Sequence, residues 1–438
     1  MEIDKTTVKD LAIFDGQENV SIFSRLNLCV TSRGEIEMAK NLAVPLATLQ
    51  AITNVQQAIK FMGTSLQQWP LTISNGTIMV VERFFESVFD SIPVKPSVVG
   101  ALSYKILSNS DFTLIKYSIG HCFDFVKAMH DFAHFSFEDS TPLLIQQVID
   151  GIKKITSHPK LTAVLRYNKA AEMPAATMLE LAHFLRYRYK NDVLQLLQLF
   201  GKIDAWYGMA NAVKLYQLSF PTFTNSEDTV LEATGLYHIL LKEPVSYDIM
   251  MNKDSNFIFL TGANMAGKST YIKAVGIAVF LAHTGMGVPA QYMKLSVLDG
   301  MLSNINVIDN VAKGESYFFN EVQRIKATIY KVNNGKKWLI LIDELFKGTN
   351  VQDAMKCSTS VIEGLLKVKH SLFILSTHLY EIGEELKKHS NIVFNYFETT
   401  VTDDQLSFSY HLKQGISNDR LGFLILKKEG VVEMLEKL

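Results

Sequence analysis

The chain has few cysteines, few prolines and no long apolar run. Its 438 residues include 3 cysteines and 10 prolines. Cys29, Cys122 and Cys357 are widely scattered without C-x-x-C spacing, so we expect buried thiols in a reducing cytoplasm. No apolar stretch reaches the roughly 18–20 residues of a membrane span. The N-terminus also lacks the charged-then-apolar pattern of a signal peptide. These absences predict a cytoplasmic protein.

An excess of basic residues is also missing. The formal net charge is −1, so any contact with DNA must come from a local patch and not from bulk charge. The hydrophobic content of 48% is ordinary for a globular protein. A chain of this length can bury a large core and should hold two or three domains.

Residues 1–225 read as a mostly helical domain. Ser32–Ala43 precedes a proline that stops a helix, and apolar residues recur at helical spacing from Leu49 to Met62. Thr141 followed by Pro142 predicts an N-cap and a first helical position. From Pro174 to about Tyr216 the helical pattern persists, with a possible interruption at Gly201. Such a long helix would act as a lever. Residues 90–140 suggest short helices joined by loops, one of them at 108–111.

The pattern changes after the loop-forming stretch 219–228. Apolar, strand-like runs at Phe257–Leu260, Trp338–Ile342 and Leu372–Leu375 then alternate with helical segments, which is typical of an α/β sheet. Two β-rich runs around the turn at 402–404 predict an antiparallel hairpin on the sheet edge. We therefore expect a second domain at residues 226–438.

A phosphate-binding loop follows the first of these strands. Gly262, Gly267, Lys268 and Ser269 occupy the fixed places of G-x-x-x-x-G-K-S, between a strand and a helix. The glycines let backbone N–H groups point at a phosphate, and the helix adds its positive N-terminal end. Lys268 would reach the β and γ phosphates, and the Ser269 hydroxyl would coordinate Mg²⁺. The motif predicts that the chain binds a nucleoside triphosphate.

Two further strands end in polar residues at the expected site. Asp343 and Glu344 follow the apolar run Leu339–Ile342, at the carboxyl end where α/β ligand sites lie. Asp343 would hold Mg²⁺ or its water, and Glu344 would polarise the attacking water. His378 ends another strand and could sense the γ phosphate, although a lone histidine is more often structural.

The motifs together resemble one family. TGANMAGKST, GMGVPA, DNVAKGESYFFNE, LIDELFKGTN and STH occur in the order found in the MutS family of DNA mismatch-repair ATPases. The resemblance covers the whole second domain and extends more weakly to residues 10–46 and 203–223. It implies an α/β P-loop ATPase of the ABC type, preceded by a mostly helical core and lever domain. It also implies a homodimer through the ATPase domains, with two composite ATP sites and a repair-protein partner.

The resemblance assigns a role to each motif residue. Lys268 and Ser269 would bind phosphate and Mg²⁺, Asp343 would be the Walker B acid, Glu344 the general base and His378 the switch histidine. Ser316 would reach the γ phosphate of the partner subunit. The expected ATP-binding residues are Gly262, Asn264, Met265, Gly267, Lys268, Ser269, Thr270 and Ser316, and the catalytic ones are Glu344, His378 and Lys268.

Several parts of the family pattern are not matched. The mismatch-reading domain with its Phe-x-Glu wedge is not found, and Phe84–Glu86 lies in an apolar helical context that favours packing. The span available for the β-rich clamp is short, and little follows for a C-terminal dimerisation region. Ala263 and Ala266 replace a usual proline and glycine, and should be tolerated only with negative φ. Tyr317 and Lys347 also depart from the pattern.

Two functions from different classes therefore remain open. The first is an ATPase that acts on duplex or branched DNA, with the stretch 183–190 (HFLRYRYK) as a candidate phosphate-contacting patch. Basic and aromatic residues on a helix are more often a solvated face. The second is an ATP-switched scaffold dimer that acts on a protein partner. The ATP-binding half of a transporter is disfavoured, because the signature does not read LSGGQ.

Overall fold

A computed structural model describes residues 1–16, 20–64, 72–135, 141–305, 317–402, 405–417 and 430–436. The chain divides into two compact units. The helical unit contains residues 26–43 and 54–215, and the sheet unit contains residues 1–25, 44–53 and 216–438. Across the described ranges, no helix is both long and apolar enough to cross a membrane.

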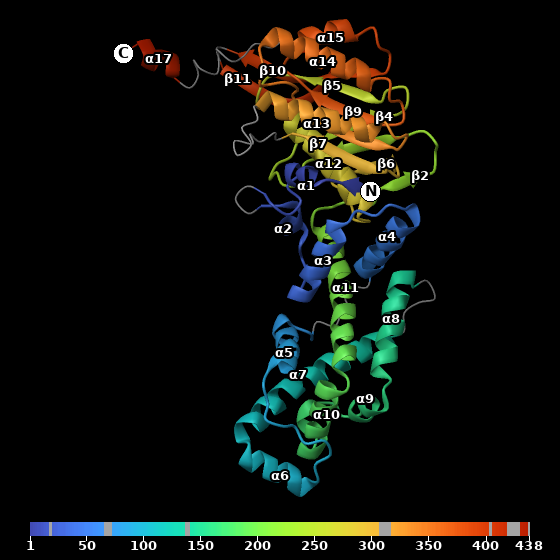
Figure 1. The fold of residues 1–438 in the computed structure, drawn as a ribbon, viewed down its shortest axis with the longest axis vertical. Coiled ribbons are helices and arrows are strands. Elements are labelled where there is room, and N and C mark those ends of the chain that lie inside the picture. The colour runs from blue at the N-terminus through green and yellow to red at the C-terminus, as the bar shows by residue number, and fades with distance from the viewer. Residues whose placement is uncertain are drawn as a thin grey trace. The chain divides into compact units, whose positions relative to one another are not determined.

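The helical unit consists of helices joined by short connections (Figure 1). The helices predicted at 32–43 and 49–62 are confirmed as α3 and α4. The helices are α3 (Ser32–Ala43), α4 (Leu49–Thr64, which begins in the sheet unit), α5 (Asn75–Glu86), α6 (Val98–Leu107), α7 (Asn109–His134), α8 (Leu143–Thr156), α9 (Pro159–Val164), the short 3-10 turn η3 (Ala170–Glu172), α10 (Ala175–Tyr187) and α11 (Lys190–Leu215).

The long helix expected from residue 174 to 216 is two helices. The break lies at Arg188 and Tyr189, whose backbone N–H groups both bond to the carbonyl of Phe184. The Tyr189 ring stacks on Phe184, and its hydroxyl donates to the carbonyl of Ile155 at 2.8 Å. Gly201 does not interrupt α11. A Cβ there would come within 3.0 Å of the Arg33 carbonyl oxygen, so the glycine serves close packing against α3.

The reading of residues 90–140 as short helices is wrong in one respect. The polar stretch 108–111, interpreted as a loop, instead begins the 26-residue helix α7, and Ser108 alone separates it from α6. Asp111 lies in the first turn of α7, where a negative charge is favourable. The start of α8 is also shifted by one residue. Pro142 is the extended N-cap and not the first helical position.

A buried carboxylate fixes the junction between α11 and the segment that leads into α3. Asp204 accepts hydrogen bonds from the backbone N–H groups of Val30 and Thr31, both at 2.9 Å, and from the Thr31 hydroxyl at 2.7 Å. Burial raises the pKa of Asp204, while these bonds act in the opposite direction. Satisfying every oxygen allows a polar group to lie in this packed junction.

The sheet unit combines two sheets with helices on their faces. The four-stranded sheet has the order β2-β6-β3-β4 and the seven-stranded sheet the order β1-β7-β8-β9-β5-β10-β11. The strands are β1 (Glu2–Ile3), β2 (Thr222–Thr224), β3 (Leu231–Leu236), β4 (Tyr247–Met251), β5 (Phe257–Thr261), β6 (Tyr292–Ser296), β7 (Gly300–Asn304), β8 (Trp338–Asp343), β9 (Leu372–Ser376), β10 (Ile392–Thr402) and β11 (Gln405–Gln414). The helices are α1 (Lys5–Asp10), α2 (Ile22–Leu26), α12 (Lys268–His283), α13 (Tyr317–Val332), α14 (Val351–Leu365), α15 (Glu381–Leu386) and α17 (Val431–Glu436).

The three predicted strands lie next to one another in the large sheet. β8, β9 and β5 pair in parallel, and the register aligns Asp343 with Ser376 and Leu260 with Ser376. The carboxyl ends of all three strands therefore meet at one edge of the sheet. The predicted hairpin is confirmed, because β10 and β11 pair antiparallel and end the sheet. Its turn at 403–404 lies outside the described residues.

Alternation along the central strands builds a core on both faces of the large sheet. Ile340 and Ile342 pack with residues of α13, α14 and α15. On the other face Leu341 approaches Gly276 of α12 so closely that a Cβ at that glycine would come within 2.6 Å of it. Strands buried on both faces read as continuous apolar runs, which explains why these strands were visible in the sequence.

The first residues of the chain pack in the sheet unit. β1 pairs in parallel with β7, and α1 lies against the same strand. Asp10 accepts hydrogen bonds from the hydroxyl of Ser303, at 2.5 Å, and from the backbone N–H of Ile305, at 3.1 Å. The chain returns from α11 to the sheet unit at Tyr216, near the expected boundary at 225.

Candidate functional site: a P-loop nucleotide pocket

The loop between β5 and α12 has the backbone shape that its sequence predicts. Gly262 has φ of 137° and Gly267, the N-cap of α12, has φ of 113°. Both values lie in the region that favours glycine. Met265 also has a positive φ, of 68°. Ala263 and Ala266 are not among the residues with positive φ, so the condition for tolerating these alanines is met.

Lys268 is held at the centre of this loop. Its Nζ donates to the carbonyl oxygens of Gly262 at 2.8 Å and Ala263 at 3.0 Å. The residue is only 5% exposed, and burial lowers the pKa of Lys268, while the nearby carboxylates of Glu344 and Asp343 oppose that shift. A buried ammonium group with these neighbours is a strong partner for a phosphate anion.

Asp343 links the second strand motif to the P-loop. One carboxylate oxygen accepts from the Ser269 hydroxyl at 2.5 Å, and the other accepts from the Ser376 hydroxyl. The side chain is buried at the end of β8. A serine hydroxyl and a carboxylate in contact are hard oxygen donors, the kind that Mg²⁺ prefers. The two residues therefore fit the predicted metal.

Glu344 follows Asp343 in a conformation that turns it away from the strand. Its φ is 63°, and its backbone N–H donates to the Ser376 carbonyl at 3.0 Å. Its Oε2 lies 3.6 Å from Nδ1 of His378 and 3.1 Å from Nζ of Lys347. The His378 side chain first, and Lys347 next, lower the pKa of Glu344 to about 2, against the effect of burial. Glu344 is consequently ionised at every physiological pH.

This depressed pKa gives a pH-dependent contribution to stability. The ionised form is favoured in the folded state, so the stabilisation is full above the ordinary glutamate value of 4.5 and is lost as pH falls from there through about 2. At pH 7 wild type should exceed Glu344→Gln in unfolding free energy by on the order of 2–3 kcal/mol. Urea unfolding of both proteins between pH 7 and pH 3 measures this difference. A difference that stays constant over that range would show that Glu344 titrates normally.

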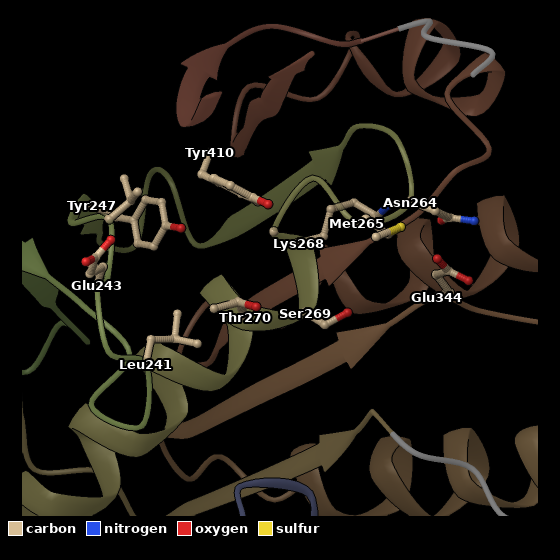
Figure 2. Close-up of a pocket in the computed structure, with 12 residues that line it drawn as sticks. Leu241, Glu243, Tyr247, Asn264, Met265, Lys268, Ser269, Thr270, Glu344 and Tyr410 are labelled. Atoms are coloured by element: carbon tan, nitrogen blue, oxygen red, sulfur yellow. The ribbon is translucent and has the colours of Figure 1, made fainter. Parts of the chain in front are cut away.

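The two motifs line one pocket of about 470 Å³. Figure 2 shows Asn264, Met265 and Glu344 at one end, Glu243 and Tyr247 at the other, and Lys268 and Tyr410 between them. Seven of the predicted residues line it: Asn264, Met265, Gly267, Lys268, Ser269, Thr270 and Glu344. Gly262, Asp343 and His378 do not line the pocket but contact residues that do. Ser316 lies outside the described residues.

Sequence reasoning missed the aromatic part of the pocket. Tyr410 is 42% exposed, comes from the edge strand β11, and has a φ of 54° that turns its ring away from the regular strand pattern. Tyr247 comes from β4 and packs edge-on against Tyr271 and Phe397. Neither tyrosine belongs to a motif. They reach the P-loop only because β4 and the hairpin fold beside it, so the sequence offered no local signal for them.

In the candidate DNA patch at 183–190, the structure uses one of the basic residues for packing. Arg186 donates to the carbonyls of Phe84 and Ser87, and its guanidinium lies 4.8 Å from the Phe89 ring centroid. It therefore supports packing inside the helical unit and is not a free phosphate contact. Arg188 and Lys190 are exposed. Phe84 is fully buried in α5, which confirms that the formal Phe-x-Glu at 84–86 is packing.

The fold and the site together define a P-loop ATPase domain. A strand, a glycine loop and a helix present a lysine and a serine to a carboxylate on a neighbouring parallel strand. Residues 258–436 match the family model described as MutS domain V, which is an ATPase domain. Over these residues the chain is a MutS-family ATPase domain.

Curated relatives agree with this assignment over about half of the chain. The DNA mismatch repair protein MutS of Thermotoga maritima is 31% identical over 251 residues, which cover 56% of this chain and 30% of the relative. The MutS of Fervidobacterium nodosum is 29% identical, with 56% and 30% covered. MutS protein homolog 4 of Mus musculus is 29% identical, with 53% and 25% covered. The match thus spans less than a third of each relative's own length.

Proposed function

We propose that this chain binds ATP with Mg²⁺ and hydrolyses it at the pocket between the P-loop and β8. The observation that carries the proposal is the hydrogen bond between Ser269 and Asp343. It joins the P-loop to the end of β8, next to the buried Lys268 of the P-loop. The pocket itself supplies a cation, a hydroxyl and a carboxylate from Lys268, Ser269 and Glu344, and the Asp343 carboxylate is bonded to that hydroxyl.

Each residue contributes a separate part of the chemistry. Lys268 would bind the β and γ phosphates, while Ser269 and Asp343 would hold Mg²⁺, which neutralises phosphate charge when bound. Glu344 would orient and polarise the attacking water. Its low pKa makes it a weak proton acceptor, so we assign it a mainly electrostatic role in the resting site. His378, beside Glu344, would fix that carboxylate and respond to the γ phosphate.

The base and sugar of ATP would lie toward the aromatic end of the pocket. Tyr247 lies at that end, Val245 adds an apolar side chain, and Tyr410 offers an exposed ring between it and the P-loop. Glu243 adds a carboxylate that can accept hydrogen bonds from ribose hydroxyls. This division places the polar phosphates at the P-loop and the flat base against apolar surface, as small-molecule sites usually do.

The complete catalytic unit would be a dimer. MutS family proteins generally form dimers. We propose a homodimer through the ATPase domains, in which Ser316 reaches the nucleotide of the partner subunit and ATP stabilises the interface. The helical domain, predicted at 1–225, corresponds to the compact unit of residues 26–43 and 54–215 and would respond to the nucleotide state. The ATPase domain, predicted at 226–438, would bind and hydrolyse the nucleotide, and residues 1–25 and 44–53 pack with it in the sheet unit. A repair protein is a further proposed partner.

We also propose that ATP turnover is coupled to duplex or branched DNA in mismatch repair or a related repair or recombination role. The support is the MutS-family ATPase domain and two exposed cations, Arg188 and Lys190, at the break between α10 and α11. Because Arg186 is engaged by packing, this surface offers fewer phosphate contacts than the sequence predicted. Binding should therefore be of modest affinity.

DNA binding should depend strongly on salt and weakly on mismatches. Contacts to phosphates release counterions, so affinity for a four-way junction, a G·T mismatch and a homoduplex should each fall steeply between 50 and 200 mM salt. Replacing Arg188 and Lys190 together by glutamine should reduce the salt slope by about 2. Titration of labelled DNA with and without ATP measures this, with the exposed Lys356→Gln on α14 as the matched control.

The outcome separates the two proposed functions. A mismatch preference of tenfold or more, about 1.4 kcal/mol, would contradict the expectation of weak discrimination. If ATP drives dimer formation but no DNA binds at low salt, the scaffold alternative is the better description. In that case the nucleotide state would serve a protein partner.

A further inference from the structure

Glu321 is a buried carboxylate that lies outside the pocket. It is the fifth residue of α13 and is 4% exposed. Its Oε1 accepts the backbone N–H of Lys347 at 3.2 Å, and its Oε2 accepts the backbone N–H of Gly348 at 3.4 Å. Burial raises the pKa of Glu321, while hydrogen bonds from the loop oppose that shift. One carboxylate thus uses both oxygens to hold the loop that follows Glu344.

That loop has an unfavourable backbone. Glu344 has φ of 63° and Phe346 has φ of 59°, both in the left-handed region that glycine normally occupies. Non-glycine residues persist there only where the surrounding structure fixes them. α13 supplies this support twice, because the ring of Phe318 lies 5.7 Å from that of Phe346 and Glu321 holds the next two N–H groups.

Side chains of the loop reach the nucleotide site. Lys347 places its Nζ 3.1 Å from Glu344, and Glu344 itself lines the pocket. If the loop relaxed toward ordinary φ values, the Glu344 carboxylate would change direction. Displacements of about 1 Å at a reacting group can lower a rate by a factor on the order of 100. The support of the loop therefore bears directly on the chemistry.

We propose that Glu321 is a positioning residue for ATP hydrolysis. It holds the backbone of residues 347 and 348 and thereby sets the direction of the Glu344 side chain. This inference rests on the proposed ATPase function. It adds that α13, which directly follows the Ser316 segment in sequence, is physically bonded to the loop that carries Glu344. A movement at the start of α13 would therefore be passed to the loop that carries Glu344.

Glu321→Gln tests the proposal, because glutamine keeps the volume but offers one acceptor oxygen to two N–H donors. We expect kcat to fall at least tenfold, while the affinity for ATP changes less than threefold. Glu384→Gln, the same change at a side chain that is 67% exposed, should leave both values unchanged. Steady-state turnover and titration with a fluorescent ATP analogue, both on the 438-residue chain, measure these two values.

If Glu321 only stabilised the fold, its replacement would not lower kcat selectively. Unchanged kcat in Glu321→Gln, or a parallel loss of turnover and ATP affinity, would overturn the proposal. Combining Glu321→Gln with Glu344→Gln should give little further loss in single-turnover hydrolysis, because both changes act on one group. An additional tenfold loss in the double variant would also overturn it.

Two controls keep these outcomes distinct. If wild-type protein shows no ATP turnover, the proposed function fails and not the role of Glu321. If Glu321→Gln does not fold, Glu321→Asp replaces it, since the shorter carboxylate keeps the charge but withdraws the oxygens from the loop. The same split between kcat and ATP affinity is then expected, and its absence overturns the proposal.

Discussion

Lys268→Ala should weaken ATP binding by at least a hundredfold, or about 2.7 kcal/mol. The change removes a buried ammonium group from the centre of the P-loop and leaves the negative phosphates without their principal cation. It also leaves the carbonyl oxygens of Gly262 and Ala263 without the donor they have in the structure. Titration calorimetry with ATP in the presence of Mg²⁺ measures the loss.

The matched control is Lys356→Ala, which removes an exposed lysine on α14. It should bind ATP as wild type does. Circular dichroism establishes that both variants fold. An ATP affinity within threefold of wild type in folded Lys268→Ala would mean that the P-loop does not bind the triphosphate in the proposed way.

Glu344→Gln should keep ATP binding and lower turnover by at least a hundredfold. Glutamine has the shape of glutamate but lacks the charge that Lys347 and His378 stabilise, so it cannot polarise water to the same degree. Binding should survive because the phosphate ligands are other residues. Measuring ATP affinity and phosphate release in the same preparation separates the two effects.

Normal hydrolysis in Glu344→Gln would remove Glu344 from the proposed role. Loss of binding together with turnover would instead point to damage of the pocket as a whole. Slow hydrolysis with retained binding would also yield a protein suited to capturing the ATP-bound dimer. The sedimentation behaviour of that variant then tests whether ATP promotes association.

The P-loop and the strand that ends in Asp343 were predictable because their signals are local. A buried parallel strand reads as an apolar run, and the loop that follows needs glycine at positions of positive φ. The motifs therefore indicated Lys268, Ser269 and Glu344 as members of one pocket, and the structure brings these three together. Their chemical roles stay predictions until the variants above are measured.

The structure was less predictable where a residue type is compatible with two different local structures or contacts. The stretch 108–111 could form a loop or begin a helix, and the fold uses it to begin α7. Gly201 could break a helix or allow close packing, and contact with α3 decides for packing. The same applies to Arg186, whose charge suggested DNA while its partners turned out to be two backbone carbonyls in the helical unit.

The sequence alone determined the nucleotide motifs, their order, and the alternation of strands and helices that makes this an α/β ATPase domain after a helical region. These depend on spacing within a few residues, which a linear sequence records directly. Tertiary structure alone decided that β1 pairs with β7, that Tyr410 reaches the pocket, and that Glu321 holds the loop after Glu344. Such contacts join residues far apart in the chain, and only the packing of the whole domain fixes which of them meet.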